Sequence, residues 1–341
     1  MQQTILVTGG AGYIGSHCCV QLLEQNYQVV ILDNLSNSSD KSLARIEQIT
    51  GKTAHFYQGD IRDKAILRQI FQSHKIDAVI HFAGLKAVGE SMQIPLTYFD
   101  NNISGSVCLF EVMQEFKVGH IVFSSSATVY GDAHTSPLHE GLSTATPTNN
   151  YGYSKLVVEQ ILQATAASNP LWSVALLRYF NPIGAHHSGL IGEDPNGIPN
   201  NLLPFVTQTA LGKRPILSIY GKDYPTDDGT CIRDYIHVVD LARAHLKALE
   251  YLFKHRPSLE IWNVGTGTGY SVLDIVQRFE QVNHIALNYQ FVERREGDVA
   301  ICFANANKAE KELGFVAEFD LDTMLKDAWH WQQKNPNGYA D

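Results

Sequence analysis

The sequence TILVTGGAGYIG, residues 4–15, runs from a β-branched apolar stretch into a glycine-rich turn. An amphipathic pattern continues to Leu23, and a second apolar run, residues 29–32, stops at Asp33. Strand, glycine turn, helix, strand and terminal acid form the layout of a dinucleotide-binding βαβ unit. A glycine-rich turn in an ordinary α/β protein would leave the acid at the end of an apolar strand unexplained.

Each part of this unit has a physical role toward a dinucleotide. The glycines let backbone N–H groups approach a pyrophosphate, and the following helix N-terminus offers a partial positive charge. Asp33 would accept hydrogen bonds from the adenosine ribose hydroxyls, and its charge would repel a 2′-phosphate. Because no arginine follows before Arg45, we expect the cofactor to be NAD rather than NADP.

The alternation of short apolar runs and helical patterns continues along the first half of the chain. Further strand-like runs are residues 54–57, 78–82 and 121–124. This order predicts an α/β fold with a doubly wound parallel sheet of the Rossmann type, in which ligands bind at the carboxyl ends of the strands. We expect an NAD-binding domain over residues 1–181, a return to it over about 234–262, and a smaller α/β substrate lobe over 182–341.

Composition narrows the class of protein. The 341 residues carry 26 Lys and Arg against 35 Asp and Glu, a net charge of −9, which argues against nucleic-acid or anionic-membrane partners. The five cysteines form no CxxC and no spacing typical of a metal site, so we expect no metal and a reducing compartment. We find neither a basic leader nor an apolar run of membrane-spanning length. These features predict a soluble cytoplasmic protein.

Tyr151 and Lys155 stand four residues apart at the start of a helical pattern and would share one helix face. A tyrosine has a pKa of about 10, and a nearby ammonium together with the positive nicotinamide ring would favour its phenolate. That phenolate could take a proton from a hydroxyl while hydride leaves the same carbon. Ser126, at the end of its strand-like run, would hold the substrate oxygen. A surface Tyr/Lys pair is common at this spacing, so the prediction depends on the NAD site upstream.

Further motifs carry a family resemblance. The segments are TGGAGYIGSH, LDNLSN, HFAGLKAVGES, FSSSATVYG, NNYGYSK, LRYFNPIGAH, DGTCIRDYIHVVDLA and RREGDVA. Together they resemble the extended short-chain dehydrogenase/reductases and, within that family, the UDP-hexose 4-epimerases. The resemblance runs in register from residue 4 to about residue 335.

The resemblance implies three groups of site residues. The catalytic set would be Ser126, Tyr151 and Lys155. The NAD contacts would be Gly9, Gly12, Tyr13, Ile14, Gly15, Asp33, Asn34, Ser38, Asp60, Ile61, Phe82, Ala83, Lys86, Asn101, Ser124, Tyr151, Lys155 and Tyr179. The UDP-sugar contacts would be Lys86, Ser126, Tyr151, Asn181, Asn200, Asn201, Leu202, Ser218, Tyr220, Arg233, Arg295, Asp298 and Cys302. Two arginines suit a pyrophosphate dianion, although Arg233 could instead pair with Asp234 on the surface.

The implied activity is 4-epimerisation of UDP-galactose to UDP-glucose, a step of galactose metabolism, by transient oxidation at C4. Ser126 is followed by Ala127, Thr128 and Val129, which hold no proton-transfer group. Related dehydratases carry an Asp-Glu pair there, so elimination is disfavoured. Cys302 stands where some family members have a tyrosine against the sugar's 2-substituent. The smaller cysteine predicts that UDP-GalNAc and UDP-GlcNAc are also interconverted.

Two alternative functions and the oligomeric state remain open at this point. A nucleotide-sugar dehydrogenase or reductase would consume external NAD, and a non-catalytic NAD-binding module would not need Ser126, Tyr151 and Lys155 together. The resemblance also implies a homodimer, for which the helical patterns at 103–116 and 156–166 offer apolar faces. The same faces could cover the protein's own sheet.

Overall fold

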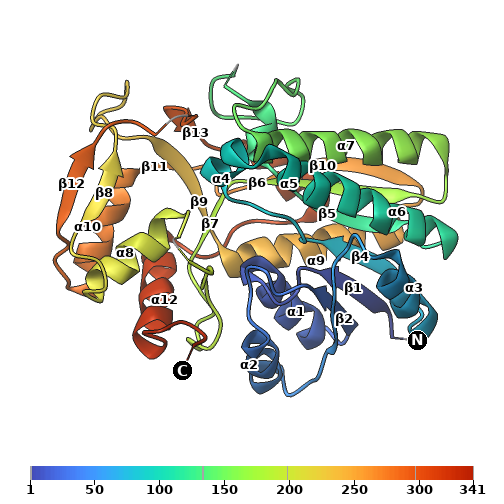
Figure 1. Ribbon diagram of the computed structural model, residues 1–341. Helices are drawn as coiled ribbons and strands as arrows, with labels where there is room; N and C mark the ends of the chain where they lie inside the picture. The colour runs from blue at the N-terminus through green and yellow to red at the C-terminus, as the bar shows by residue number, and fades with distance from the viewer. Residues whose placement is uncertain (1, 133, 198, 296, 341) are drawn as a thin grey trace.

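A parallel sheet of seven strands organises the chain up to residue 179 and takes its seventh strand from residues 258–264 (Figure 1). The computed structural model describes residues 2–132, 134–197, 199–295 and 297–340. All six neighbouring strand pairs are parallel. In spatial order the strands are β10 (Ser258–Val264), β6 (Ser173–Tyr179), β5 (His120–Ser126), β4 (Ala78–His81), β1 (Thr4–Thr8), β2 (Gln28–Asp33) and β3 (His55–Gln58). The predicted doubly wound parallel sheet is confirmed.

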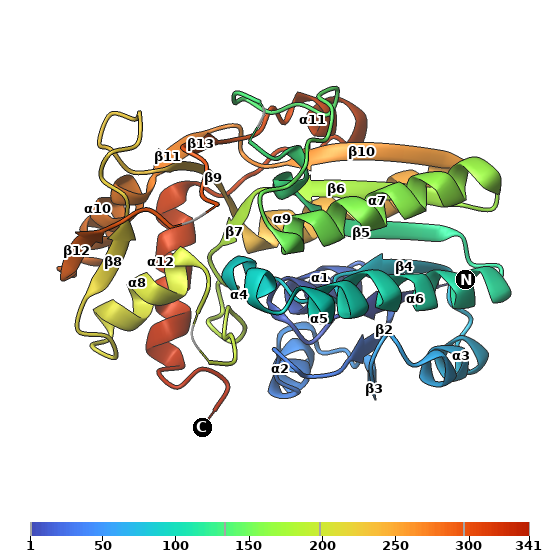
Figure 2. The same ribbon diagram turned by 45° about the horizontal axis from the view of Figure 1, so that its top comes forward.

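Helices cover both faces of this sheet (Figure 2). Successive strand side chains point to opposite faces, so Ile5 and Val7 join one core while Leu6 joins the other. Burial on both faces explains why these strands are continuous apolar runs. The helices of one face are α1 (Tyr13–Glu24), α2 (Lys41–Thr50), α9 (Val238–Lys254) and α11 (Asn307–Leu313), and those of the other are α3 (Lys64–Ser73), α6 (Gly105–Glu115) and α7 (Asn150–Ser168).

Short helical elements follow β4 and β5 at the carboxyl edge of the sheet. They are α4 (Val88–Gln93), α5 (Pro95–Phe99), the π-helical turn η1 (Asp100–Ser104) and the 3₁₀ turn η2 (Ala127–Tyr130). Asn101 of η1 lines the cavity at this edge, where ligands of such sheets bind.

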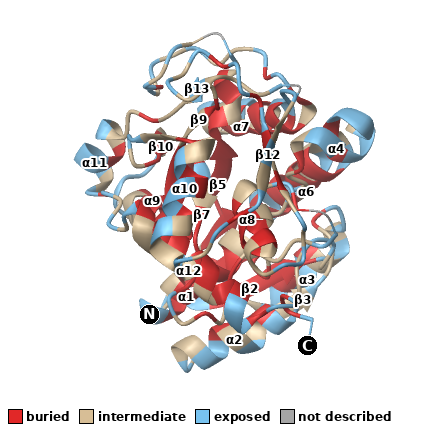
Figure 3. Ribbon diagram, turned by 90° about the vertical axis from the view of Figure 1, so that its left-hand side faces the viewer, coloured by how far each residue is buried: buried red, intermediate tan, exposed pale blue. Residues whose placement is uncertain are grey.

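Two small sheets and three helices form the other part of the molecule, on the left of Figure 1. Val206, Phe279, Leu325 and Trp329 belong to its apolar core, and Figure 3 shows buried and exposed residues sharing the turns of its outer helices. One sheet joins β7 (Asn181–Ile183), β9 (Ile232–His237), β11 (Gly269–Ser271) and β13 (Ile301–Cys302), and the other pairs β8 (Leu217–Tyr220) with β12 (Tyr289–Val292). The helices are α8 (Leu202–Ala210), α10 (Val272–Asn283) and α12 (Leu321–Lys334).

The strand order reverses beside β1. The chain adds β2 and β3 on one side of β1 and then β4 on the other, which leaves a switch point between β1 and β4. There the backbone of Gly9 approaches that of Ala83 so closely that a Cβ on Gly9 would lie 2.8 Å from the Ala83 nitrogen. Doubly wound sheets bind their ligands at this kind of position.

Candidate active site

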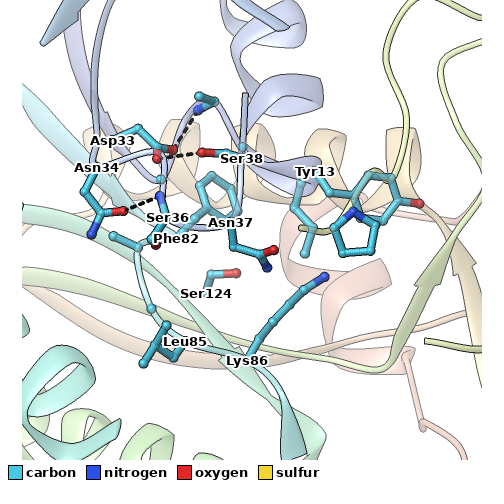
Figure 4. A pocket seen from close by; sticks show the side chains of 18 of the residues that line it. Tyr13, Asp33, Asn34, Ser36, Asn37, Ser38, Phe82, Leu85, Lys86 and Ser124 are labelled. Atoms are coloured by element: carbon cyan, nitrogen blue, oxygen red, sulfur yellow. Dashed lines mark hydrogen bonds between the residues drawn. The ribbon is translucent and has the colours of Figure 1, made fainter. Parts of the chain in front are cut away.

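A cavity opens at the switch point, along the carboxyl ends of the central strands (Figure 4). All the NAD contacts implied by the resemblance line it except Asp60. The Asp60 carboxylate instead accepts hydrogen bonds from Arg62 and from Asn34 Nδ2, at 3.1 Å. The hydrogen bond from Arg62 is the main cause that lowers the Asp60 pKa to about 2.

The glycine turn has the shape that a pyrophosphate needs. Gly9 has a φ of +73°, and a Cβ on Gly15 would lie 2.2 Å from the Gly9 carbonyl oxygen, so neither position accepts a side chain without distortion. Gly12 precedes α1 without a side-chain cap. The first N–H groups of α1 are therefore left for an anion in the cavity.

Asp33 is the last residue of β2 and contacts the glycine turn. Its Oδ2 accepts a hydrogen bond from the Ala11 N–H at 3.0 Å, and its Oδ1 accepts from Ser38 Oγ at 2.8 Å (Figure 4). Arg45 does not line the cavity, and its guanidinium lies 4.7 Å from the centre of the Tyr339 ring. With an acid and no arginine at the ribose position, the residues present fit NAD rather than its 2′-phosphorylated form.

Lys86 reaches into the cavity and links it to the second half of the chain. Its Nζ lies 3.0 Å from Glu193 Oε1, and the same oxygen accepts a hydrogen bond from Asn201 Nδ2 at 2.6 Å. Burial acts to lower the Lys86 pKa, but the Glu193 charge outweighs it and leaves that pKa raised. Lys86 therefore places a positive charge, fixed by its ion pair with Glu193, in the lining of the dinucleotide cavity.

Tyr151 and Lys155 lie on one face of α7, as their spacing predicts. Asn149 starts this helix with its Oδ1 accepting from the Gly152 N–H at 2.8 Å. Lys155 Nζ donates to the Ser124 carbonyl at 2.8 Å and lies 5.9 Å from the centre of the Tyr151 ring. Ser126, at the end of β5, is close enough for its hydroxyl to affect the Tyr151 pKa.

Burial controls the protonation of this pair. It raises the Tyr151 pKa well above its ordinary value, an effect that Tyr179 increases and Ser126 opposes. Burial also lowers the Lys155 pKa to about 8, although the Glu159 charge acts in the other direction. The predicted phenolate relies on the nicotinamide charge as well as on the lysine, and the lysine by itself does not offset this burial. Desolvation is the larger effect, and a further positive charge is needed.

A second polar cluster lies between β9, β13 and the segment before β13. Asp298 accepts from Arg295 Nη2 at 2.9 Å and contacts Arg233 Nη2 at 3.5 Å. Cys302 pairs in register with Arg233 across β13 and β9. Asp234 does not pair with Arg233, because its carboxylate accepts hydrogen bonds from other residues, including both backbone and side chain of Thr266.

Six further residues implied as sugar contacts, all between residues 181 and 220, do not line the dinucleotide cavity. Asn181 starts β7, Asn201 directly precedes α8, and Ser218 and Tyr220 lie on β8. Asn200 is exposed, and Leu202 is the first residue of α8. Of this set, Asn201 alone hydrogen-bonds Glu193 among the interactions of the described residues.

Among the described residues, no group of three or more His, Cys, Asp or Glu side chains could hold a metal ion. Likewise, none of the described helices is both long and apolar enough to cross a bilayer. His81 is a buried histidine hydrogen-bonded to Thr8 and Ser106 at 2.6 and 2.9 Å.

Comparison with known proteins agrees with this geometry. The model of the NAD dependent epimerase/dehydratase family matches residues 5–265. The chain belongs to this family. It is 58% identical to UDP-glucose 4-epimerase of Pasteurella multocida, over 99% of both chains, and 56% identical to that of Bacillus subtilis, over 98% of both.

Solved structures of the epimerase family share the whole fold. UDP-glucose 4-epimerase from Bifidobacterium longum, in complex with NAD+ and UDP, has a TM-score of 0.96 and 49% identity, covering 98% of this chain and all of the other. The UDP-Glc/GlcNAc 4-epimerase of Campylobacter jejuni has a TM-score of 0.83 and 35% identity, covering 97% and 99% of the two chains.

Several cavity residues were missed from the sequence. Ser36 and Asn37 belong to the quoted LDNLSN motif, so a signal for them existed. The loop at residues 192–195 and Tyr339 carry no comparable pattern, because tertiary contacts alone bring them to the cavity. The lining residues outside the predicted set are Ala11, Leu32, Ser36, Asn37, Gly59, Gly84, Leu85, Gly192, Glu193, Asp194, Pro195 and Tyr339.

Proposed function

We propose that this protein is an NAD-dependent isomerase that interconverts UDP-galactose and UDP-glucose by transient oxidation at C4, a step of galactose metabolism. The observation that carries the proposal is the set of Ser126, Tyr151 and Lys155 beside the dinucleotide cavity. The full-length similarity to UDP-glucose 4-epimerases supports the same activity.

In this proposal, the glycine turn of residues 9–15 and the first turn of α1 would hold the pyrophosphate of NAD, and Asp33 would hold its adenosine ribose. Residues 1–181, with the return at about 234–262, form the NAD-binding domain, and residues 182–341 form the UDP-sugar lobe. When bound, NAD accepts a hydride from the sugar's C4 and gives it back.

The side chains of this protein do the remaining work. Tyr151 Oη takes the proton of the sugar 4-hydroxyl and later returns it, while the Ser126 hydroxyl hydrogen-bonds the sugar oxygen. Lys155, held by the Ser124 carbonyl, keeps a positive charge near the phenolate. Arg233 and Arg295 hold the substrate pyrophosphate as the sugar turns over, because two guanidinium groups can bridge its oxygens.

Elimination and net redox chemistry fit the site less well. Ala127, Thr128 and Val129 in the turn after Ser126 offer no general acid or base, so a 4-keto sugar can only be reduced again. A dehydrogenase would need to exchange its cofactor in every cycle. The relatives, named as epimerases, do not favour that alternative.

A second activity, interconversion of UDP-GalNAc and UDP-GlcNAc, is favoured by Cys302. The residue is in register with Arg233, in the cluster proposed to hold the substrate pyrophosphate. A thiol in place of a phenol ring leaves space for an N-acetyl group. The Campylobacter jejuni relative, named as a UDP-Glc/GlcNAc 4-epimerase, gives this proposal further support.

We also propose a cytoplasmic homodimer. All five cysteines are free, which suits a reducing compartment. The helical segments 103–116 and 156–166 form the proposed subunit contact, and Leu96 and Tyr153, exposed at 81% and 44%, lie next to them in the chain. Light scattering on the purified protein tests the dimer, and a monomer at every concentration would contradict it.

The first experiment supplies UDP-galactose and no cofactor. Purified protein is incubated with the sugar nucleotide, which is followed by NMR. Conversion to UDP-glucose supports both epimerisation and a retained cofactor. Absence of conversion, even with NAD supplied, contradicts the proposal, and conversion only in step with accumulating reduced cofactor favours the dehydrogenase.

A further inference from the structure

One wall of the dinucleotide cavity comes from the second half of the chain. Residues 189–196, here called the strap, contribute Gly192, Glu193, Asp194 and Pro195 to the lining. The strap is also tied to the β2–α2 loop, because the Asn196 N–H donates to Asn37 Oδ1 at 2.9 Å and its side-chain Nδ2 donates to the Ser36 carbonyl at 3.1 Å. Glu193 ties it to Lys86 on the far side.

The C-terminal tail, residues 335–340, holds the strap in place. The Tyr339 N–H donates to Asp194 Oδ2 at 2.6 Å, and the Gly192 N–H lies 3.5 Å from the Tyr339 hydroxyl. Asn335 Nδ2 donates to the Gly189 carbonyl at 2.9 Å. Tyr339, which is 5% exposed, lines the cavity itself.

Two glycines allow the strap to lie directly against its supports. A Cβ on Gly192 would lie 2.4 Å from the Trp331 ring, and one on Gly338 would lie 2.1 Å from the Asp194 carboxylate. Gly338 also has a φ of +66°, which favours glycine. The close packing leaves little freedom for the strap to shift without moving the tail.

Arg45 of α2 bonds both the strap and the C-terminal tail. Its Nη1 donates to the Leu190 carbonyl at 2.9 Å and to Asn335 Oδ1 at 2.7 Å. Its guanidinium lies 4.7 Å from the centre of the Tyr339 ring and 5.5 Å from that of Trp331. Strap, tail and α2 therefore form one bonded unit around the open side of the cavity.

We propose that the strap and the C-terminal tail retain NAD in its site from one turnover to the next. The inference rests on the proposed function, in which the cofactor is restored in each cycle and does not need to be exchanged. The Tyr339 ring beneath Arg45 and the Asn196 side-chain amide at the Ser36 carbonyl hold the wall, so loss of either side chain should speed release of the dinucleotide.

The test measures NAD release rather than turnover. Purified wild-type, Tyr339→Ala and Asn196→Ala proteins are loaded with labelled NAD, and loss of label into excess unlabelled NAD is followed. Tyr339→Phe is the matched control, since it keeps the ring beneath Arg45 and removes only the hydroxyl, whose contact with the Gly192 N–H is long at 3.5 Å. Circular dichroism checks the fold, and the exposed Asn196 offers a variant with little risk to folding.

Tyr339→Ala should raise the release rate roughly tenfold and Asn196→Ala roughly threefold, with Tyr339→Phe close to wild type. Folded Tyr339→Ala and Asn196→Ala proteins that release NAD at the wild-type rate would overturn the inference while leaving the proposed function intact. A wild-type protein that neither carries nor takes up NAD would instead contradict the proposed function.

Discussion

At Tyr151, burial and charge act on one hydroxyl in opposite directions. Desolvation raises its pKa, whereas a phenolate is the form that accepts the sugar proton. The buried Lys155 is held at the Ser124 carbonyl rather than against the phenol oxygen. In the proposed mechanism, the positive charge of a bound cofactor would have to offset this burial for the phenolate to form.

Replacing Tyr151 by phenylalanine removes the proton acceptor while keeping the ring. We expect kcat to fall by about 10²- to 10⁴-fold, with the fold unchanged, because general base catalysis contributes about that much. The rate is measured with UDP-galactose and the fold by circular dichroism. Near-normal turnover in a folded protein would remove Tyr151 from the mechanism.

Cys302 pairs in register with Arg233, and in the proposed function its small side chain leaves room for an N-acetyl group. Cys302→Tyr should lower turnover of UDP-GalNAc by at least about tenfold and leave UDP-galactose nearly unaffected, because the ring occupies the room of the N-acetyl group. Cys302→Ser, which keeps the volume, is the control. Equal loss of both activities would show general damage to the sugar site and count against the proposed specificity.

Helix α7 carries Tyr151 and Lys155, the proposed catalytic pair, and its first turn has a side-chain cap from Asn149. Asn149→Ala should cost about 1 kcal/mol of unfolding free energy and lower kcat roughly tenfold, because Tyr151 lies two residues beyond the cap. The matched control is Asp63→Ala, which removes the cap of α3, where Asp63 Oδ1 accepts from the Ala65 N–H at 2.8 Å. It should cost similar stability without lowering kcat. A similar loss of kcat in both variants would mean that the cap acts only through stability.

The same helix is joined to β6 by a buried ion pair. Arg178 Nη2 lies 2.7 Å from Glu159 Oε2, with the two side chains 3% and 0% exposed. Glu159→Gln should destabilise the protein by about 3–5 kcal/mol, because it leaves the arginine charge buried without its partner. Urea unfolding measures this. Glu115→Gln, at the exposed pair with Arg68, should cost less than about 1 kcal/mol, and equal costs would contradict the argument.

Across the whole molecule, buried neutral histidines link stability to pH. Burial lowers the pKa values of His17 and His81 to about 3 and that of His245 to about 4. The unfolded chain binds these protons below a pH of about 6.5, whereas the folded chain does not. Their contribution is therefore complete above that pH and is lost as pH falls toward the folded values.

As the pH falls through this range, each such histidine should reduce the unfolding free energy by up to about 1.4 kcal/mol per pH unit. Urea unfolding at about pH 7 and about pH 5 measures the slope. His17→Gln should make the slope shallower, while a change at the exposed His255 should leave it unchanged. Equal slopes in all three proteins would refute the assignment to buried histidines.

The patterns that identified this protein are local in the chain. Residues 4–33 contain a complete βαβ unit, and the spacing of Tyr151 and Lys155 places both on one helix face, because strand and helix periodicities act over a few residues. The cavity wall from Asp194 and Tyr339 could not be read in this way, since its parts lie 145 residues apart and meet only through packing. The same holds for the pKa of Tyr151. Its spacing from Lys155 predicts a nearby positive charge, whereas the direction of the pKa shift depends on how far the assembled fold excludes water, a property of the whole structure.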